Sequence, residues 1–418
     1  FVSATGGWFQ GVALGWLVLD LTGSPAALGW VMMAMMGPVS ALGVFGGALV
    51  DRIDRRRLVL VTTAIGAVAV GAMAALVFTD RATMTTIIIC ALVLGTANAA
   101  LWPAMQSFLK ELVPGARLRD AIAVNSARFH LTRVLGPAIA GVVLARFGPA
   151  VCLAITAVSM LGVMVAAWFI HRPTSRKGGG QPLFSAITEG IRFVRGERFV
   201  FRTLVVTAVF SIMVVPYESQ LPTFVREVLN AGAERLGLLL STVGFGAVAG
   251  AVLSGTPLVK QRPGVWMAVY AMAAGVALLV LALTAPGGRL PQPFAIGALA
   301  LSGFGVIGYL TTANATVQVR VPEPLMGRVM GLWVVVNAGG VPLGSVLMGS
   351  AAERVSLPTV LLWSGAIGIA VGVFALATRI FIGSRHIPAT EATEVERLDR
   401  IAETLAPKEH LQPEQRAA

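Results

Sequence analysis

The stretch GALVDRIDRRR, residues 47–57, separates two long apolar segments and decides the fold class. Trp30 to Val50 before it and Leu58 to Thr79 after it carry no charged residue. A helix needs about 20 apolar residues to cross a bilayer core. The stretch is therefore the turn between two membrane-spanning helices. Short basic turns stay on the cytoplasmic side, so we expect this one to be cytoplasmic.

The composition excludes an ordinary soluble enzyme. Of 418 residues, 56% are hydrophobic and 12% are charged, and the mean hydropathy is +0.80. Soluble domains carry about 25% charged residues. The 47 glycines suit close helix packing in lipid. We interpret the net charge of +12 as a positive-inside bias with attraction to anionic membrane lipid, and not as a sign of nucleic-acid binding.

Several classes of site have no support in the sequence. Cys90 and Cys152 lie inside apolar segments, so we expect neither a disulfide framework nor a metal site. Every lysine follows a residue other than glycine, which excludes the Gly-Lys pair of an ATP-binding loop. We expect no enzymatic activity and no cofactor. The chain begins at Phe1 inside an apolar stretch, and we expect a short preceding segment to be missing.

Hydropathy predicts an all-α polytopic membrane protein with twelve spans. Unbroken apolar runs exclude the alternating pattern of a β-barrel. The predicted spans are residues 1–21, 26–50, 58–79, 84–108, 121–145, 149–170, 200–222, 234–257, 264–286, 293–318, 328–351 and 358–382.

The long polar insertion after the sixth span divides the chain into two halves. We expect six-helix bundles at 1–171 and 199–383, a cytoplasmic loop at 172–198, and a cytoplasmic tail at 384–418 with a short amphipathic helix. Faint similarity between the halves predicts a transporter fold with a central site between repeats.

Charge fixes the orientation of the spans. Most of the 32 Lys and Arg residues lie on the side of the 47–57 turn, in the central insertion or in the tail, so both termini should be cytoplasmic. The opposite loops hold only Arg81, Arg146, Arg226, Arg235, Arg289 and Arg354.

Two motifs resemble those of the major facilitator superfamily, and the likeness extends over essentially the whole chain. The turn matches that family's signature G-x-L-x-D-R-x-x-R-R/K, with Asp54 where a glycine is usual; the matching residues are Gly47, Leu49, Asp51, Arg52, Arg55 and Arg56. The fifth span carries Gly136, Pro137 and Gly141, similar to the G-P-x-x-x-G motif of drug/proton antiporters.

The likeness extends to one branch of the superfamily. Residues 102–141 and 321–333 look like the branch that contains siderophore and macrolide exporters. Antiporters of the superfamily often carry an arginine in the fourth helix, and this chain has none in its fourth span. A coupling mechanism based on that arginine therefore does not transfer to this chain.

The motifs admit two interpretations each. Asp51, near Arg328 at the start of the eleventh span, either latches the cytoplasmic side shut, as the resemblance implies, or serves orientation alone. Gly136 and Pro137 form either a packing kink or a hinge that prevents leakage.

Charged residues within spans are candidates for coupling or substrate binding. An arginine near the middle of a bilayer costs at least about 2.5–3.5 kcal/mol, so Arg133 should face the bundle interior, either for structural pairing or for function. His130 either carries protons or is a satisfied buried histidine. Glu218 is either a proton carrier or a solvated residue near the mouth, and Asp20 is either a helix-end charge or a coupling residue.

Polar and aromatic residues in the central spans predict a large, mostly apolar cavity for amphiphilic compounds. The candidate cavity residues are Gln10, Asn98, Trp102, Asn125, Tyr217, Asn314, Gln318, Trp333 and Asn337.

The sequence thus predicts a monomeric secondary transporter of a bacterial inner membrane. It should export an amphiphilic small molecule, such as a drug, macrolide or siderophore, against proton entry by alternating access. An importer or uniporter of a small metabolite, and a non-transporting membrane sensor or scaffold with the same fold, are the alternatives.

Overall fold

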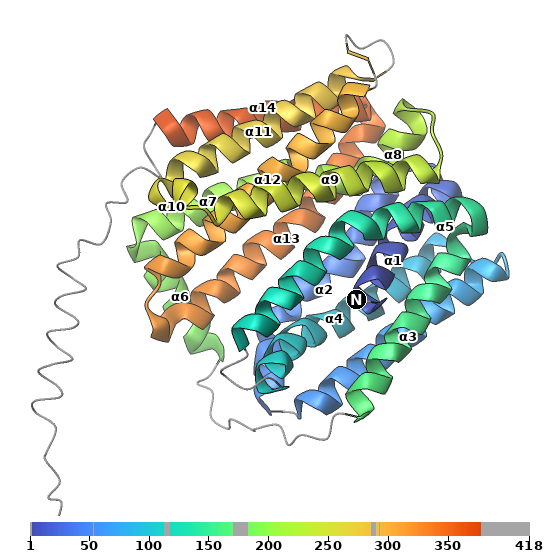
Figure 1. The fold of residues 1–418 in the computed structure, drawn as a ribbon, viewed down its shortest axis with the longest axis horizontal. Helices are drawn as coiled ribbons and strands as arrows, with labels where there is room; N and C mark the ends of the chain where they lie inside the picture. Colours follow the sequence, from blue (N-terminus) through green and yellow to red (C-terminus); the bar gives the residue numbers. More distant parts are fainter. Residues whose placement is uncertain are drawn as a thin grey trace, which may run out of the picture.

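The helices of this chain form two bundles, one from each half of the sequence (Figure 1). The computed structural model describes residues 2–52, 54–112, 118–169, 183–285, 290–291 and 293–377, and no strand occurs among them. The first bundle contains α1 (Val2–Thr22), α2 (Pro25–Arg52), α3 (Arg55–Phe78), α4 (Met84–Leu112) and α5 (Leu118–Phe169).

The second bundle follows a short helix, α6 (Leu183–Gly196), that lies at the bundle's edge. Its elements are α7 (Arg198–Met213), η2 (Val215–Gln220), α8 (Leu221–Thr223), η3 (Phe224–Val228), α9 (Ala233–Ser254), α10 (Pro257–Gln261), α11 (Pro263–Leu283), α12 (Pro293–Arg320), α13 (Glu323–Val355) and α14 (Leu357–Ala377).

The helices account for the twelve predicted spans. Ten helical segments of the described residues are long and apolar enough to cross a membrane. One of them, Val124–Phe169, is 46 residues long and is broken at Gly148 (φ 79°, ψ 174°), where the chain turns back (Figure 1). Positive φ favours glycine, and Pro149 then starts the next helix. With this segment making two crossings, the 21-residue α1 completes the twelve.

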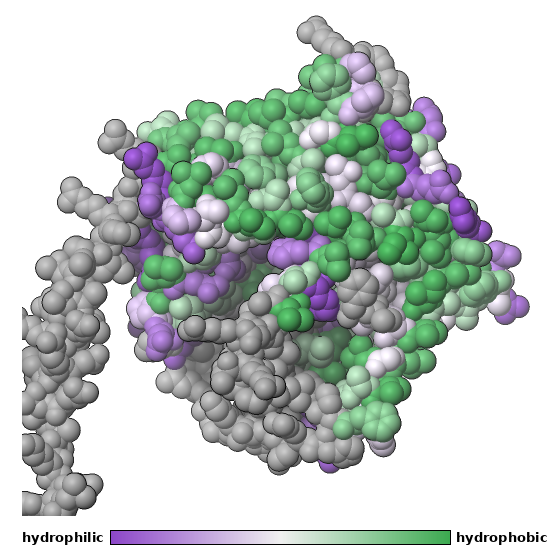
Figure 2. Space-filling view, viewed as in Figure 1, coloured by the Kyte–Doolittle hydropathy of each residue, from purple (hydrophilic) through white to green (hydrophobic). Residues whose placement is uncertain are grey.

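Small residues allow the helices of the second bundle to approach closely. A Cβ added to Gly246 of α9 would collide with the Ala300 carbonyl of α12, and one added to Gly303 of α12 would collide with the Val243 carbonyl of α9. Backbone contact of this kind is typical of helices that pack in lipid. Large apolar side chains are exposed on the outside of the bundles (Figure 2), as expected of a surface that faces acyl chains.

The seventh predicted span is irregular. Its α-helix ends at Met213, and a 3-10 turn, a short α-helical piece and a π-helical turn follow in η2, α8 and η3. Pro216 and Pro222 lie in the first turns of η2 and α8, where proline interrupts the regular ladder of hydrogen bonds. Non-α turns inside a span frequently mark functional sites.

The structure contains one helix that the sequence analysis did not predict. A second helix, predicted in the tail, cannot be compared with the structure. Residues 172–198 were predicted to be a loop, but they contain α6, whose apolar side packs on α13 and α7. The amphipathic helix predicted in the tail falls outside the described residues.

Candidate functional site

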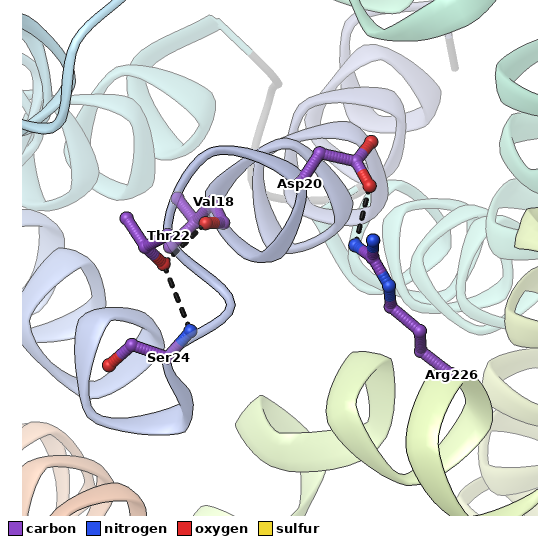
Figure 3. Close-up of polar contacts among 5 residues, drawn as sticks. All are labelled: Val18, Asp20, Thr22, Ser24 and Arg226. Carbon is purple, nitrogen blue, oxygen red and sulfur yellow. Dashed lines mark hydrogen bonds and ion pairs between the residues drawn. The ribbon is translucent and has the colours of Figure 1, made fainter.

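We call the end of the molecule with the α2–α3 turn the turn end, and the end with the α1–α2 turn the far end. At the far end the two bundles are joined by an ion pair. Arg226 Nη1 of η3 lies 2.5 Å from Asp20 Oδ1 of α1 (Figure 3), and both side chains are about two-fifths exposed. The Arg226 guanidinium also lies 6.0 Å from the ring of Trp16. Asp20 is thus a far-end contact between bundles.

A second far-end contact joins the start of α2 to the end of α13. Gly23 takes a positive φ of 61°, and Ser24 then caps α2 by accepting a hydrogen bond from Ala27 N at 3.1 Å. The Glu353 carboxylate accepts hydrogen bonds from the Ser24 hydroxyl and from Ala26 N. A negative charge at a helix N-terminus is favourable, so Glu353 stabilises the far end of α2 from the other bundle.

Glycines bring the two bundles into backbone contact near the far end. A Cβ added to Gly29 of α2 would lie 2.5 Å from the Ser345 carbonyl oxygen of α13. One added to Gly141 of α5 would lie 2.7 Å from Gly237 Cα of α9. The second glycine of the antiporter-like motif is therefore a contact point between bundles, which closes the far end.

The exposure of α5 changes along the face that meets α1 of the same bundle. Phe129 is 52% exposed and Ser126 is exposed, both toward the turn end. Two to three helical turns further along the same face, Gly136 and Ala140 are buried. A Cβ on Gly136 would lie 2.5 Å from the Trp8 ring of α1. Figure 2 shows a hollow with hydrophilic surface between the bundles. Because the contacts of Gly29 and Gly141 close the far end, this cleft opens toward the turn end.

The charged candidates of the fifth and seventh spans meet where this cleft closes. Arg133 Nη2 of α5 lies 3.8 Å from Glu218 Oε2 of η2, which joins the two bundles by a second ion pair. Arg133 is 15% exposed and Glu218 is 31% exposed, so water reaches the pair. Arg133 Nε and the nearby His130 Nδ1 are buried without a hydrogen-bond partner. Arg133 Nε–H can donate a hydrogen bond to a ligand or a water, and His130 Nδ1 can exchange one with either.

Arg128 belongs to a different surface. Its position along α5 places it on the same side of the helix as Val124, Leu131 and Leu135. These three side chains are between 43% and 69% exposed and form the outer side of α5. Asn125 Oδ1 accepts a hydrogen bond from Arg128 at 2.9 Å. Asn125 therefore supports this peripheral arginine, whereas Arg133 and His130 lie on the inner side of the helix.

The other predicted cavity residues are dispersed. Tyr217 and Trp333 are buried in the core of the second bundle, and Gln10 is buried with its Nε2 unpartnered. Asn314 and Gln318 are hydrogen-bonded to each other on α12. Asn98 and Asn337 are half-buried, and the Trp102 side chain lies outside the description.

Residues of the basic turn at 47–57 stabilise the ends of helices within the first bundle. Asp54, the departure from the signature, caps α3 by accepting a hydrogen bond from Arg57 N at 2.8 Å. Arg56 donates to the carbonyls of Ala167 and Trp168 at the end of α5, the first through Nε at 2.9 Å. These contacts tie the third span to the sixth.

The gate predicted around Asp51 is described only in part. The side chains of Gly47, Asp51, Arg52 and Arg55 lie outside the description. Arg328, its predicted partner in the second turn of α13, forms an ion pair with Glu189 of α6. No group of His, Cys, Asp and Glu in the described ranges could hold a metal ion.

The contacts between bundles at the far end, which we call the far-end seal, involve residues that the sequence analysis did not single out. The sequence indicates only a loop position for Arg226 and assigns no role to Glu353, Ser345 or Gln220. A signal existed for Ser24, because serine followed by proline is a typical helix start. The partners of Glu353 and Arg226 lie more than 200 residues away in sequence.

Comparisons with known proteins agree with this architecture. The model of a family described as transmembrane secretion effector matches residues 1–414. The multidrug efflux pump Tap of Mycobacterium tuberculosis is 26% identical over 373 residues, covering 85% of this chain and 86% of Tap. The staphyloferrin A transporter of Staphylococcus aureus is 25% identical over 366 residues, covering 84% and 87%.

A solved structure shows the same fold. A variant of the nucleoside transporter NupG superposes with a TM-score of 0.73 at 13% identity, over 90% of this chain and 97% of NupG. That identity bears on the fold alone. The family match covers nearly the whole chain, and two bundles of membrane-crossing helices enclose a cleft that is closed at one end. The chain belongs to the transmembrane secretion effector family of the major facilitator superfamily.

Proposed function

We propose that this transporter exports amphiphilic small molecules in exchange for protons, by alternating access, from the inner membrane of a bacterium. The turn end faces the cytoplasm in this proposal, because the basic turn lies there. The structure then corresponds to an inward-open state, with the far end sealed and the cleft ready to take substrate from the cytoplasm. The protein works as a monomer, with one cleft per chain.

The observation that carries the proposal is the Arg133–Glu218 ion pair at the closed end of the cleft. It joins the two bundles, and the Glu218 side chain remains about one-third exposed. Protonation of Glu218 would remove its charge and leave Arg133 unpaired. Removing one partner of a buried pair costs about 3–5 kcal/mol, and less for a pair that water reaches. Protonation can therefore change the balance between two bundle arrangements.

The substrate class follows from the surface near the pair. Ser126 is exposed on the face of α5 that carries Arg133. Among the described side chains of that face, Arg133 is the charged one that pairs with the other bundle. Few fixed charges among apolar groups suit amphiphilic compounds. The relatives Tap and the staphyloferrin A transporter are named for a multidrug and a siderophore cargo, which supports export of such molecules.

Flux measurements in proteoliposomes with an imposed pH gradient test the proposal. With ethidium and erythromycin as probes, we expect proton-driven accumulation in the wild type. Glu218→Gln should abolish this accumulation but keep substrate exchange without a gradient, because exchange needs no proton turnover. Glu227→Gln, an exposed carboxylate on η3, is the matched control and should behave as the wild type.

Two results would contradict the proposal. Proton-driven accumulation at the wild-type rate in Glu218→Gln would remove Glu218 from coupling. Absence of any flux of both probes in the wild type would contradict export of amphiphilic compounds, and would favour the sensor or scaffold with the same fold.

A further inference from the structure

The residues that flank Glu218 are each attached to a different helix. On one side, the hydroxyls of Tyr217 and Ser302 of α12 lie 2.8 Å apart in a buried hydrogen bond. On the other side, the hydroxyl of Ser219 donates a hydrogen bond that is shared between Pro216 O at 2.7 Å and the hydroxyl of Ser345 of α13 at 3.1 Å. Glu218 thus lies between two serine anchors of the second bundle.

The next residue reaches the first bundle. Gln220 Nε2 donates to the Pro25 carbonyl of α2 at 3.3 Å, and it lies 3.5 Å from the Ser345 carbonyl. Ser345 is fully buried, and its hydroxyl donates to Val341 O at 2.9 Å within α13. Ser345 therefore contacts two of the residues that follow Glu218, one through its hydroxyl and one through its carbonyl.

The turn depends on these anchors because its own backbone is weakly constrained. Glu218 lies in a 3-10 turn, where hydrogen-bond geometry is poorer than in an α-helix. Pro216 removes a donor from that turn. The separation of 3.8 Å between Arg133 and Glu218 is close to the limit of about 4 Å for an ion pair. A small displacement of the turn would therefore break the pair.

We propose that Ser345 is a positioning residue that holds Glu218 within reach of Arg133 through its hydrogen bond to Ser219. This inference rests on the proposed coupling role of Glu218. The Ser219–Ser345 bond lies within the second bundle and can persist while the bundles move. The Gln220–Pro25 bond crosses between bundles and breaks when the far end opens. Ser345 thus keeps the carboxylate oriented in both arrangements.

The test measures the Arg133–Glu218 interaction without using transport. In purified protein, the shifts in unfolding temperature for Arg133→Gln, Glu218→Gln and the double variant give an interaction term for the pair. The same cycle is then repeated with Ser345→Ala. We expect Ser345→Ala to remove at least half of the interaction term. A residue that only stabilises packing would lower every unfolding temperature equally and leave the term unchanged.

Matched variants separate positioning from general damage. Ser159→Ala is the control, because Ser159 is a buried serine whose hydroxyl donates to Thr156 O within its own helix, and it should leave the term unchanged. Ser219→Ala removes the same bond from the other side and serves if Ser345→Ala does not fold. Ser219→Cys with Ser345→Cys, with Cys90 and Cys152 replaced by alanine, should restore the term when oxidised and lose it when reduced.

The outcomes are distinct. An unchanged interaction term in both Ser345→Ala and Ser219→Ala would overturn the inference, as would a term of zero in the starting protein. Failure of the proposed function would appear differently, as wild-type proton-driven flux in Glu218→Gln. The interaction term does not depend on cargo or on proton movement.

Discussion

Glu353→Gln should weaken the far-end seal by about 1 kcal/mol. The carboxylate accepts hydrogen bonds from the Ser24 hydroxyl and from Ala26 N, across the boundary between bundles. Glutamine keeps an acceptor oxygen, so the substitution removes only the part due to charge. Charge makes such hydrogen bonds about twice as strong, and the helix N-terminus adds about 0.3–1 kcal/mol. A loss of about 1 kcal/mol corresponds to about a fivefold change in the ratio of closed to open far ends.

Electron–electron distance measurements can detect this change. Spin labels at positions 81 and 234 report the far end, because Arg81 and Glu234 are exposed and belong to different bundles. The native Cys90 and Cys152 are replaced by alanine for labelling. Glu353→Gln should increase the long-distance population about fivefold. High salt should reduce the difference between wild type and variant, because the charge interaction is exposed to solvent.

The control is the same substitution at another exposed carboxylate of the far end. Glu227→Gln changes an exposed carboxylate on η3 and should leave the distances unchanged. An unaltered distance distribution in Glu353→Gln would refute the reasoning, and so would an equal increase in Glu227→Gln. The second result would mean that net charge at the far end, and not the capped helix, sets the distance.

Three further substitutions test the packing of the fold. Gly141→Ala places a Cβ 2.7 Å from Gly237 Cα, so it should separate α5 from α9 and lengthen the distance between the same spin labels. Asp54→Ala removes the cap of α3, which costs about 1 kcal/mol, and should lower the unfolding temperature by about 2 °C, whereas Asp54→Asn should not. Arg56→Gln loses two hydrogen bonds to α5 carbonyls and should lower the unfolding temperature without changing the far-end distances.

The spans were predictable from sequence because each depends on local composition. Twenty or more apolar residues give a membrane-crossing helix wherever they occur, and the turns at 21–25 and 146–150 carry their own glycine and proline signals. The helix α6 was missed because its surroundings are basic and polar. Its apolar residues nonetheless follow a helical spacing at Leu183, Ile187, Ile191 and Val194, and that pattern was the available signal.

The pairing of site residues could not be predicted in the same way. Arg133 had to face the bundle interior on energetic grounds, and it does pair with Glu218. The register between α5 and η2 depends on packing across more than 80 residues of sequence, which a single chain does not encode locally. Tyr217 fits either a cavity wall or a core by its spacing, and its hydrogen bond to Ser302 places it in the core.

The irregular seventh span connects the cleft to the far end. Two ion pairs join the described parts of the two bundles, Arg133–Glu218 and Asp20–Arg226, and both use residues of η2 and η3. A regular helix holds its backbone rigidly through i to i−4 hydrogen bonds, whereas 3-10 and π turns change the rotation and rise per residue. This segment can therefore adjust at Glu218 without unfolding. Because Arg226 lies only eight residues further along the same segment, we expect an adjustment at Glu218 to displace the Arg226–Asp20 pair at the far end.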